Sequence, residues 1–122
     1  MIRRATPPLV TPTVTYGAVV GQVIERLRAS RGKTQDDLGA ALGIGQSAYS
    51  RLEQGQTSMT LAQLRATAEF LASSPNLIIR EADSLTVRLL AQGVVVKNDK
   101  DISPAAVLVG LGILAALIAA SR

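Results

Sequence analysis

Residues 33–55 read KTQDDLGAALGIGQSAYSRLEQG, and this stretch decides the fold. Its first part carries apolar side chains at the i, i+3, i+4 spacing of one helix face. They are Leu38, Ala41 and Leu42. The glycine-bearing segment 43–45 interrupts that pattern, and apolar spacing resumes with Ala48, Tyr49 and Leu52. We therefore predict a helix over residues 34–42, a tight turn, and a second helix over residues 46–54.

The stretch resembles the Cro and phage-repressor (XRE-type) family of helix-turn-helix proteins. The family pattern opens with Thr-Gln, continues with Leu-x-x-x-Leu-Gly and ends with Ser-x-x-Ser-Arg-Leu-Glu-x-Gly. These elements occur here at residues 34–35, 38–43 and 47–55. The resemblance covers residues 16–74. It implies an all-α fold with a five-helix, repressor-like helix-turn-helix domain that binds DNA.

At several positions in the stretch, the geometry of a helix start or helix end explains the residue type. Thr34 can cap the first helix through its side-chain oxygen. Gly43 and Gly55 stand where the two helices must end in a left-handed conformation. Gly45 replaces the Ser or Thr that caps the second helix in the family, and Tyr49 replaces a branched aliphatic residue. We expect the Tyr49 ring in the core and its hydroxyl at the rim.

In the family, the second of these helices lies in the DNA major groove and its first residues reach base edges. The resemblance implies base contacts from four residues, which are Gln46, Ser47, Ser50 and Arg51. An amide can pair with adenine and a guanidinium with guanine. Each residue also has a structural alternative: the serines can be solvated helix polars, and Arg51 can pair with an acid or touch only phosphate.

The start of the preceding helix carries the other positions that the resemblance assigns to DNA. Gln35 and Thr34 match phosphate contacts, with Gln35 also bracing the recognition helix, and backbone N–H groups at helix starts favour phosphate. Asp36 and Asp37 suit the helix dipole, but they would oppose phosphate if they turned toward it.

Further helices follow from apolar spacing on both sides of this stretch. We predict a first helix over residues 16–31, a fourth that begins after Thr60, and a fifth that ends near Gly93. The fourth carries an apolar row of Leu61, Leu64, Ala68 and Leu71. Four leucines are expected in the core, namely Leu38, Leu42, Leu52 and Leu64. The resemblance also implies a structural ion pair between Arg28 and Glu53.

Both flanks of the predicted domain are less regular. Residues 1–15 contain three prolines and are expected to form an extended, poorly ordered arm. Arg3 and Arg4 in that arm could reach a minor groove, although an unattached terminus is the simpler interpretation. Residues 94–96 suggest a short strand, which needs a partner, and one candidate is the same segment of a second subunit. Residues 75–97 thus hold the fifth helix and this strand, and residues 98–103 form a linker.

Residues 104–120 form an apolar segment without a charge, read as a C-terminal hydrophobic helix. Seventeen helical residues span about 25 Å, slightly less than a hydrocarbon core of about 30 Å. No face is polar, so we expect the helix to enter a bilayer as an anchor or to pack with its own copies or another protein. Gly112, Ala116 and Ala120 form a small-x-x-x-small row that permits close helix contact.

Composition narrows the chemistry. The 122 residues include no Cys and no His, which excludes disulfides, thiol catalysis and the usual zinc sites. Two Tyr, one Phe and no Trp argue against base stacking on an aromatic platform. A net charge of +4 is too modest to indicate nucleic acid alone. No catalytic, metal or cofactor motif is apparent, so no enzyme activity and no cofactor is expected.

These observations favour a sequence-specific transcriptional regulator that binds double-stranded DNA, as a homodimer or higher homo-oligomer. No signal peptide is apparent. We expect a cytoplasmic protein, held at the inner face of the membrane if residues 104–120 associate with it. The alternative is a membrane-anchored or self-assembling scaffold protein whose helix-turn-helix domain serves protein contacts.

Overall fold

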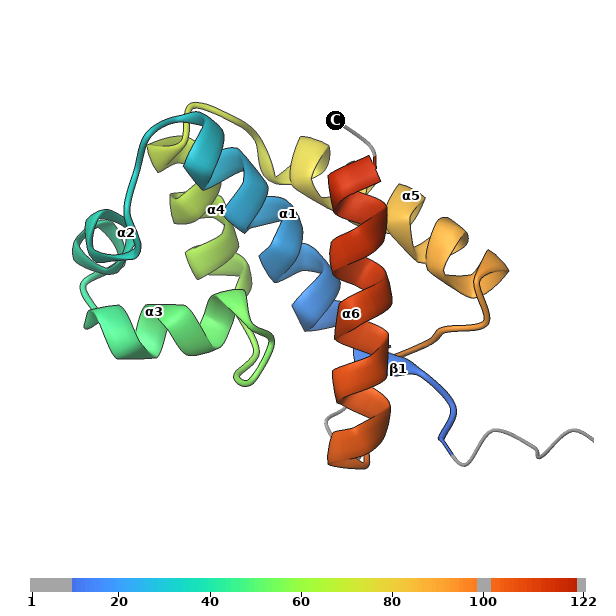
Figure 1. Ribbon diagram of the computed structural model, residues 1–122. Coiled ribbons are helices and arrows are strands. Elements are labelled where there is room, and N and C mark those ends of the chain that lie inside the picture. The colour runs from blue at the N-terminus through green and yellow to red at the C-terminus, as the bar shows by residue number, and fades with distance from the viewer. Residues whose placement is uncertain (1–9, 99–101, 121–122) are drawn as a thin grey trace, which may run out of the picture.

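Figure 1 shows the computed structural model, which describes residues 10–98 and 102–120. Within these residues the chain is mostly helical, as predicted, with two short strands. The elements in order are β1 (Thr13–Thr15), α1 (Tyr16–Ser30), α2 (Gln35–Leu42), α3 (Gln46–Glu53), α4 (Leu61–Phe70), α5 (Pro75–Ala91), β2 (Val95–Lys97) and α6 (Pro104–Ala120).

The helix ends follow the local sequence signals. Thr34 and Thr60 each cap a helix in a capping box, and Pro75 is the first residue of α5 after the N-cap Ser74. Gly43 and Gly55 adopt positive φ angles of 72° and 75°. The left-handed helix ends predicted at these two glycines are therefore confirmed.

The core is built around α1, which packs against α3 and α5 and lies in the middle of the helical layer in Figure 1. Leu38, Leu52 and Leu64 are buried as predicted, whereas Leu42 is only half-buried at the edge of the core. Leu61 was predicted on the apolar row of α4 but is 84% exposed. It is the first residue of α4, one turn before Leu64, and extends beyond the edge of the core.

The two strands pair with each other in a parallel sheet, with Val14 opposite Val96. The suggested pairing of β2 with a second subunit is therefore wrong: its partner is β1 of the same chain. The predicted arm is corrected as well, since Thr13–Thr15 is a strand in which Val14 is fully buried. A parallel pair needs a long crossover, and the five helices between the strands supply it. Arg3 and Arg4 lie outside the described residues.

Helix α6 packs on β1 and α5 of its own chain and crosses β1 in Figure 1. Gly110 approaches the backbone of Thr13 so closely that a Cβ would overlap it, and Leu114 is fully buried. The sequence suggested a bilayer, other copies or another protein as the environment of this helix, and the structure provides its own domain instead. Of the helices that the structure describes, none is both long and apolar enough to cross a membrane.

Candidate nucleic-acid interface

The turn between α2 and α3 is tight because of a glycine on α2. The amide of Ile44 donates to the carbonyl of Gly39 at 2.8 Å. A Cβ on Gly39 would lie 2.9 Å from the carbonyl oxygen of Ile44 and 3.2 Å from that of Gly45. Only a residue without a side chain lets the turn pass α2 at this distance. Gly39 therefore helps to set the angle between α2 and α3.

The four residues assigned to base contact all lie on α3. Gln46, Ser47 and Arg51 are exposed. Ser50 is half-buried, and its hydroxyl accepts a hydrogen bond from Gln54 at 3.2 Å. The N-cap Gly45 makes no side-chain hydrogen bond, so no hydroxyl competes for the first amides of α3. The helix therefore presents polar side chains and open backbone donors toward solvent.

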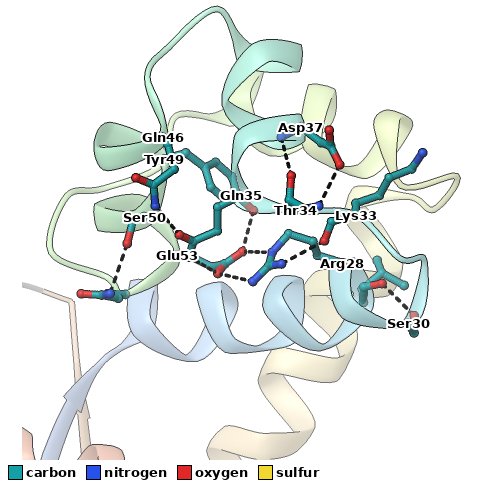
Figure 2. Close-up of polar contacts among 12 residues, drawn as sticks. Arg28, Ser30, Lys33, Thr34, Gln35, Asp37, Gln46, Tyr49, Ser50 and Glu53 are labelled. Carbon is teal, nitrogen blue, oxygen red and sulfur yellow. Dashed lines mark hydrogen bonds and ion pairs between the residues drawn. The ribbon is translucent and has the colours of Figure 1, made fainter.

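A buried carboxylate lies beneath the exposed face of α3. Glu53 at the end of α3 is only 2% exposed. Its oxygens accept hydrogen bonds from Nε and Nη2 of Arg28 at 2.8 and 3.1 Å, from Gln35 at 2.9 Å and from the Tyr49 hydroxyl at 2.8 Å. The ion pair between Arg28 and Glu53 that the resemblance implied is thus present (Figure 2). It joins α1, α2 and α3 through one group.

The same network reaches the surface through two glutamines. Because a carboxylate can only accept, the part of the Gln35 side chain that faces Glu53 must be the NH₂ group. The Gln35 carbonyl oxygen is then free to accept from Nε2 of Gln46 at 2.6 Å (Figure 2). Gln46 keeps its second amide hydrogen and its carbonyl oxygen, which is the pair that an adenine edge requires.

Burial and charge shift the ionisation of the groups around Glu53. Burial, reinforced by the Glu53 carboxylate, raises the pKa of Tyr49, so this hydroxyl remains a donor. The hydrogen bond to Glu53 raises the pKa of Arg28 further above its already high value. Nη1 of Arg28 also donates to the carbonyl of Lys33 at 3.0 Å, which fixes the approach to α2.

Thr34 and Asp37 form the capping box of α2. The Asp37 amide donates to Oγ1 of Thr34 at 3.1 Å, and the Thr34 amide donates to the Asp37 carboxylate at 2.8 Å. The hydrogen bond from the Thr34 amide to the carboxylate, reinforced by the Thr34 side chain, lowers the pKa of Asp37. The Asp37 carboxylate is thereby turned to its own helix start, while Asp36 beside it is exposed.

The structure brings most of the predicted residues together and adds one connection. Gln35, Gln46 and Glu53 form a continuous chain of hydrogen bonds that the sequence did not reveal. The Tyr49 ring is buried as expected, but its hydroxyl is bonded to Glu53 inside the domain and is not at the rim. The i, i+4 spacing of Tyr49 and Glu53 on one helix was the available signal.

An exposed polar helix held at a fixed angle by a tight turn defines the helix-turn-helix class. The helix-turn-helix domain family matches residues 19–80, slightly more than half of the 122 residues, and the chain belongs to that family. A search of curated proteins finds no match.

Similar solved structures include two of the clp gene regulator ClgR from Corynebacterium glutamicum. One has a TM-score of 0.61 at 23% identity and covers 63% of this chain and 82% of that chain. The other has a TM-score of 0.54 at 23% identity and covers 57% and 90%. At this level of identity the likeness shows a common fold.

Proposed function

We propose that the protein is a sequence-specific transcriptional regulator that binds duplex DNA with α3 in the major groove. Gln46, Ser47, Ser50 and Arg51 would face the bases. The major groove admits an α-helix and gives each base pair a distinct pattern of donors and acceptors. The structural neighbour described as a gene regulator supports the same class of function.

The phosphate contacts in this proposal come from the start of α2. Thr34 and Gln35 lie where the first amides of the helix carry partial positive charge, which favours an anion. Thr34 uses its hydroxyl oxygen as an acceptor in the cap, and its hydroxyl is exposed at the start of α2. Asp37 is held by the cap, which limits its repulsion of phosphate.

The observation that carries the proposal is the hydrogen bond between Gln46 and Gln35, backed by the buried Glu53. A surface glutamine normally samples many rotamers, and ordering it costs entropy on binding. Here the side-chain amide of Gln46 is already oriented, because it is bonded to Gln35, which is in turn bonded to the buried Glu53. Such an arrangement suits recognition of a planar base edge, and the same bonds also connect α2 to α3.

The test is selection of DNA by the full chain from a random duplex pool, followed by titration of the selected duplex at several salt concentrations. Arg51→Ala should cost about 1–3 kcal/mol and relax the preference at one base pair. Gln35→Ala should weaken binding to all sequences through the lost phosphate contact, and it should also relax the preference at the base pair that Gln46 faces, because Gln46 loses its hydrogen-bond partner. The matched control is Arg80→Ala, which removes an exposed arginine from α5. Equal effects of Arg51→Ala and Arg80→Ala on the selected duplex would reject the docking.

We further propose that the protein binds as a dimer. One helix-turn-helix unit touches few base pairs, and a two-fold pair reads two half-sites about one DNA turn apart. The selected sequences should then contain inverted repeats. A selected consensus with one half-site would argue for a monomer.

A further inference from the structure

Helix α6 has an exposed face that differs from the face on its own domain. The buried face contains Ala106, Gly110 and Leu114. The exposed residues recur at alternating spacings of three and four, which is the seam of a helix that packs along a second helix. They are Ala105, Leu108, Gly112, Ala115 and Ala119, with Val109 and Ala116 beside them. This face carries no charge or hydrogen-bonding side chain.

The side chains on this face are arranged unequally along the helix. Both large ones lie in the first half, where Leu108 is 75% exposed and Val109 is 45% exposed. The second half offers only alanines, and Gly112 lies at the centre. A Cβ built on Gly112 would meet no atom within 4 Å, so the lack of a side chain there serves no contact inside the domain.

We propose that this face pairs with the same face of a second copy, with the two α6 helices antiparallel and crossing at Gly112. A two-fold axis at that point places the half of one helix with large side chains against the alanine half of the other. Each Leu108 then lies over Ala115 and Ala116 of the other copy. The pattern is self-complementary, as an interface between identical subunits requires.

A cavity beside the face supports the same pairing. It measures about 420 Å³ and is lined by Ala115 and Leu111 of α6, Val14 of β1, Ala18 of α1 and the turn after α3. Because Ala115 forms one wall, a Leu108 from the antiparallel copy would lie at the cavity mouth. An apolar side chain there would fill space that the single chain leaves open.

A second copy fits this face better than a lipid surface does. Membrane affinity grows with the apolar area inserted, and alanine and glycine supply little. The same small residues let two helix backbones approach closely. This inference supplies the interface for the dimer in the proposed function, and it is tested below without DNA, so the two can fail separately.

Disulfide trapping tests the geometry, because the chain has no native Cys. Gly112→Cys should form a covalent dimer under mild oxidation. Ala105→Cys should not, since an antiparallel crossing at 112 separates the two copies of residue 105 by about 20 Å, beyond disulfide reach. The double variant Ala105→Cys with Ala119→Cys should crosslink efficiently. Crosslinking of Ala105→Cys alone, or none with Gly112→Cys, would overturn the antiparallel pair.

Sedimentation of the detergent-free full chain tests the interface itself. Gly112→Leu adds bulk where the domain has room, and it should raise the dimer dissociation constant by more than about tenfold without lowering the melting temperature that is recorded at concentrations where the wild type is a monomer. Leu108→Glu should do the same, whereas the control Val87→Glu, at a 67% exposed position on α5, should not. A monomeric wild type, or a dimer indifferent to Gly112→Leu, would overturn the proposal. The proposal would also be overturned if the wild type floated with phosphatidylglycerol vesicles and Leu108→Glu did not, because the exposed face would then bind lipid.

Discussion

Glu53 connects three helices of the helix-turn-helix unit through one buried side chain. Its buried carboxylate faces four donors, so its charge and its acceptor capacity are both satisfied. Glu53→Gln would replace one acceptor oxygen by a donor facing Arg28 or Tyr49 and leave the guanidinium without its counter-charge. Breaking such a pair from one side costs about 3 kcal/mol. Urea unfolding should show this loss.

The control for that experiment is an exposed ion pair in the same domain. Arg65 and Glu69 on α4 are 3.3 Å apart with side chains 76% and 66% exposed. Solvent screens such a pair, so Glu69→Gln should change the unfolding free energy by less than about 0.5 kcal/mol. Comparable losses for the two substitutions would mean that the Glu53 network does not hold the domain together.

Asp37 gives the domain a dependence on acid pH. Its folded-state pKa lies below the ordinary value of 3.8 because Thr34 donates hydrogen bonds to the carboxylate. On acidification the unfolded chain therefore takes up this proton first, so the stabilisation is present above pH 3.8 and is lost as the pH falls through the folded pKa. Asp37→Asn should lower the melting temperature at pH 6 and reduce its decline toward pH 3. A decline in Asp37→Asn as steep as that of the wild type would contradict this role of Asp37.

The roles of single residues could be predicted from the sequence where a family position or a helix end determines them. Thr34, Gly43 and Gly55 needed only local geometry. The partner of the Tyr49 hydroxyl depends on how deeply α3 lies against α1, which spacing along one helix does not determine. For the same reason the Gln35 to Glu53 bond was not predicted, since it joins two elements.

At the scale of elements, α6 contains two glycines with opposite roles. Gly110 lies against Thr13 without room for a Cβ, whereas Gly112 faces open space. Gly110→Ala should therefore lower stability by about 1–3 kcal/mol through overpacking. Gly112→Ala should raise the stability of the monomer by up to about 1 kcal/mol through helix propensity, in melts recorded at concentrations where the wild type is a monomer. Thermal melts of the two variants, recorded side by side, compare the same substitution two residues apart.

Equal effects of these two substitutions would contradict the docking of α6 on β1. The sequence could not distinguish the two glycines, because a helix that is apolar all round shows no periodic face. The small row through Gly112 was identified from spacing, and the structure leaves that row exposed. The helix thus has an intrachain face at Gly110 that the pattern did not reveal.

At the scale of the molecule, the parallel pair of β1 and β2 joins the two flanks of the helical domain. Val14 and Val94 are buried there, and α6 covers β1. Pairing between residues 13 and 95 is non-local, so helical periodicity gave no indication of it. Each flank contributes a strand of only three residues, and the two strands meet only when the helices between them have folded.

Removal of α6 should therefore destabilise the whole domain. A chain ending at Asn98 would expose Val14 and lose the buried Leu114, a side chain whose removal alone typically costs about 2–5 kcal/mol. Differential scanning calorimetry should show a clearly lower melting temperature than that of the full chain. An unchanged melt would show that α6 adds nothing to the stability of the helices.

The α6 interface and DNA binding should be coupled in the dimer. If α6 joins two copies, two α3 helices bind a duplex with two half-sites as one unit, and the second contact gains from effective concentration. Gly112→Leu should then weaken binding to the two-half-site duplex by more than about tenfold at nanomolar protein, and leave binding to a single half-site unchanged. Arg51→Ala should weaken both duplexes, because it acts within each half-site. Fluorescence anisotropy with the two duplexes separates these cases, and an equal loss on both for Gly112→Leu would place its effect inside the single domain instead of between copies.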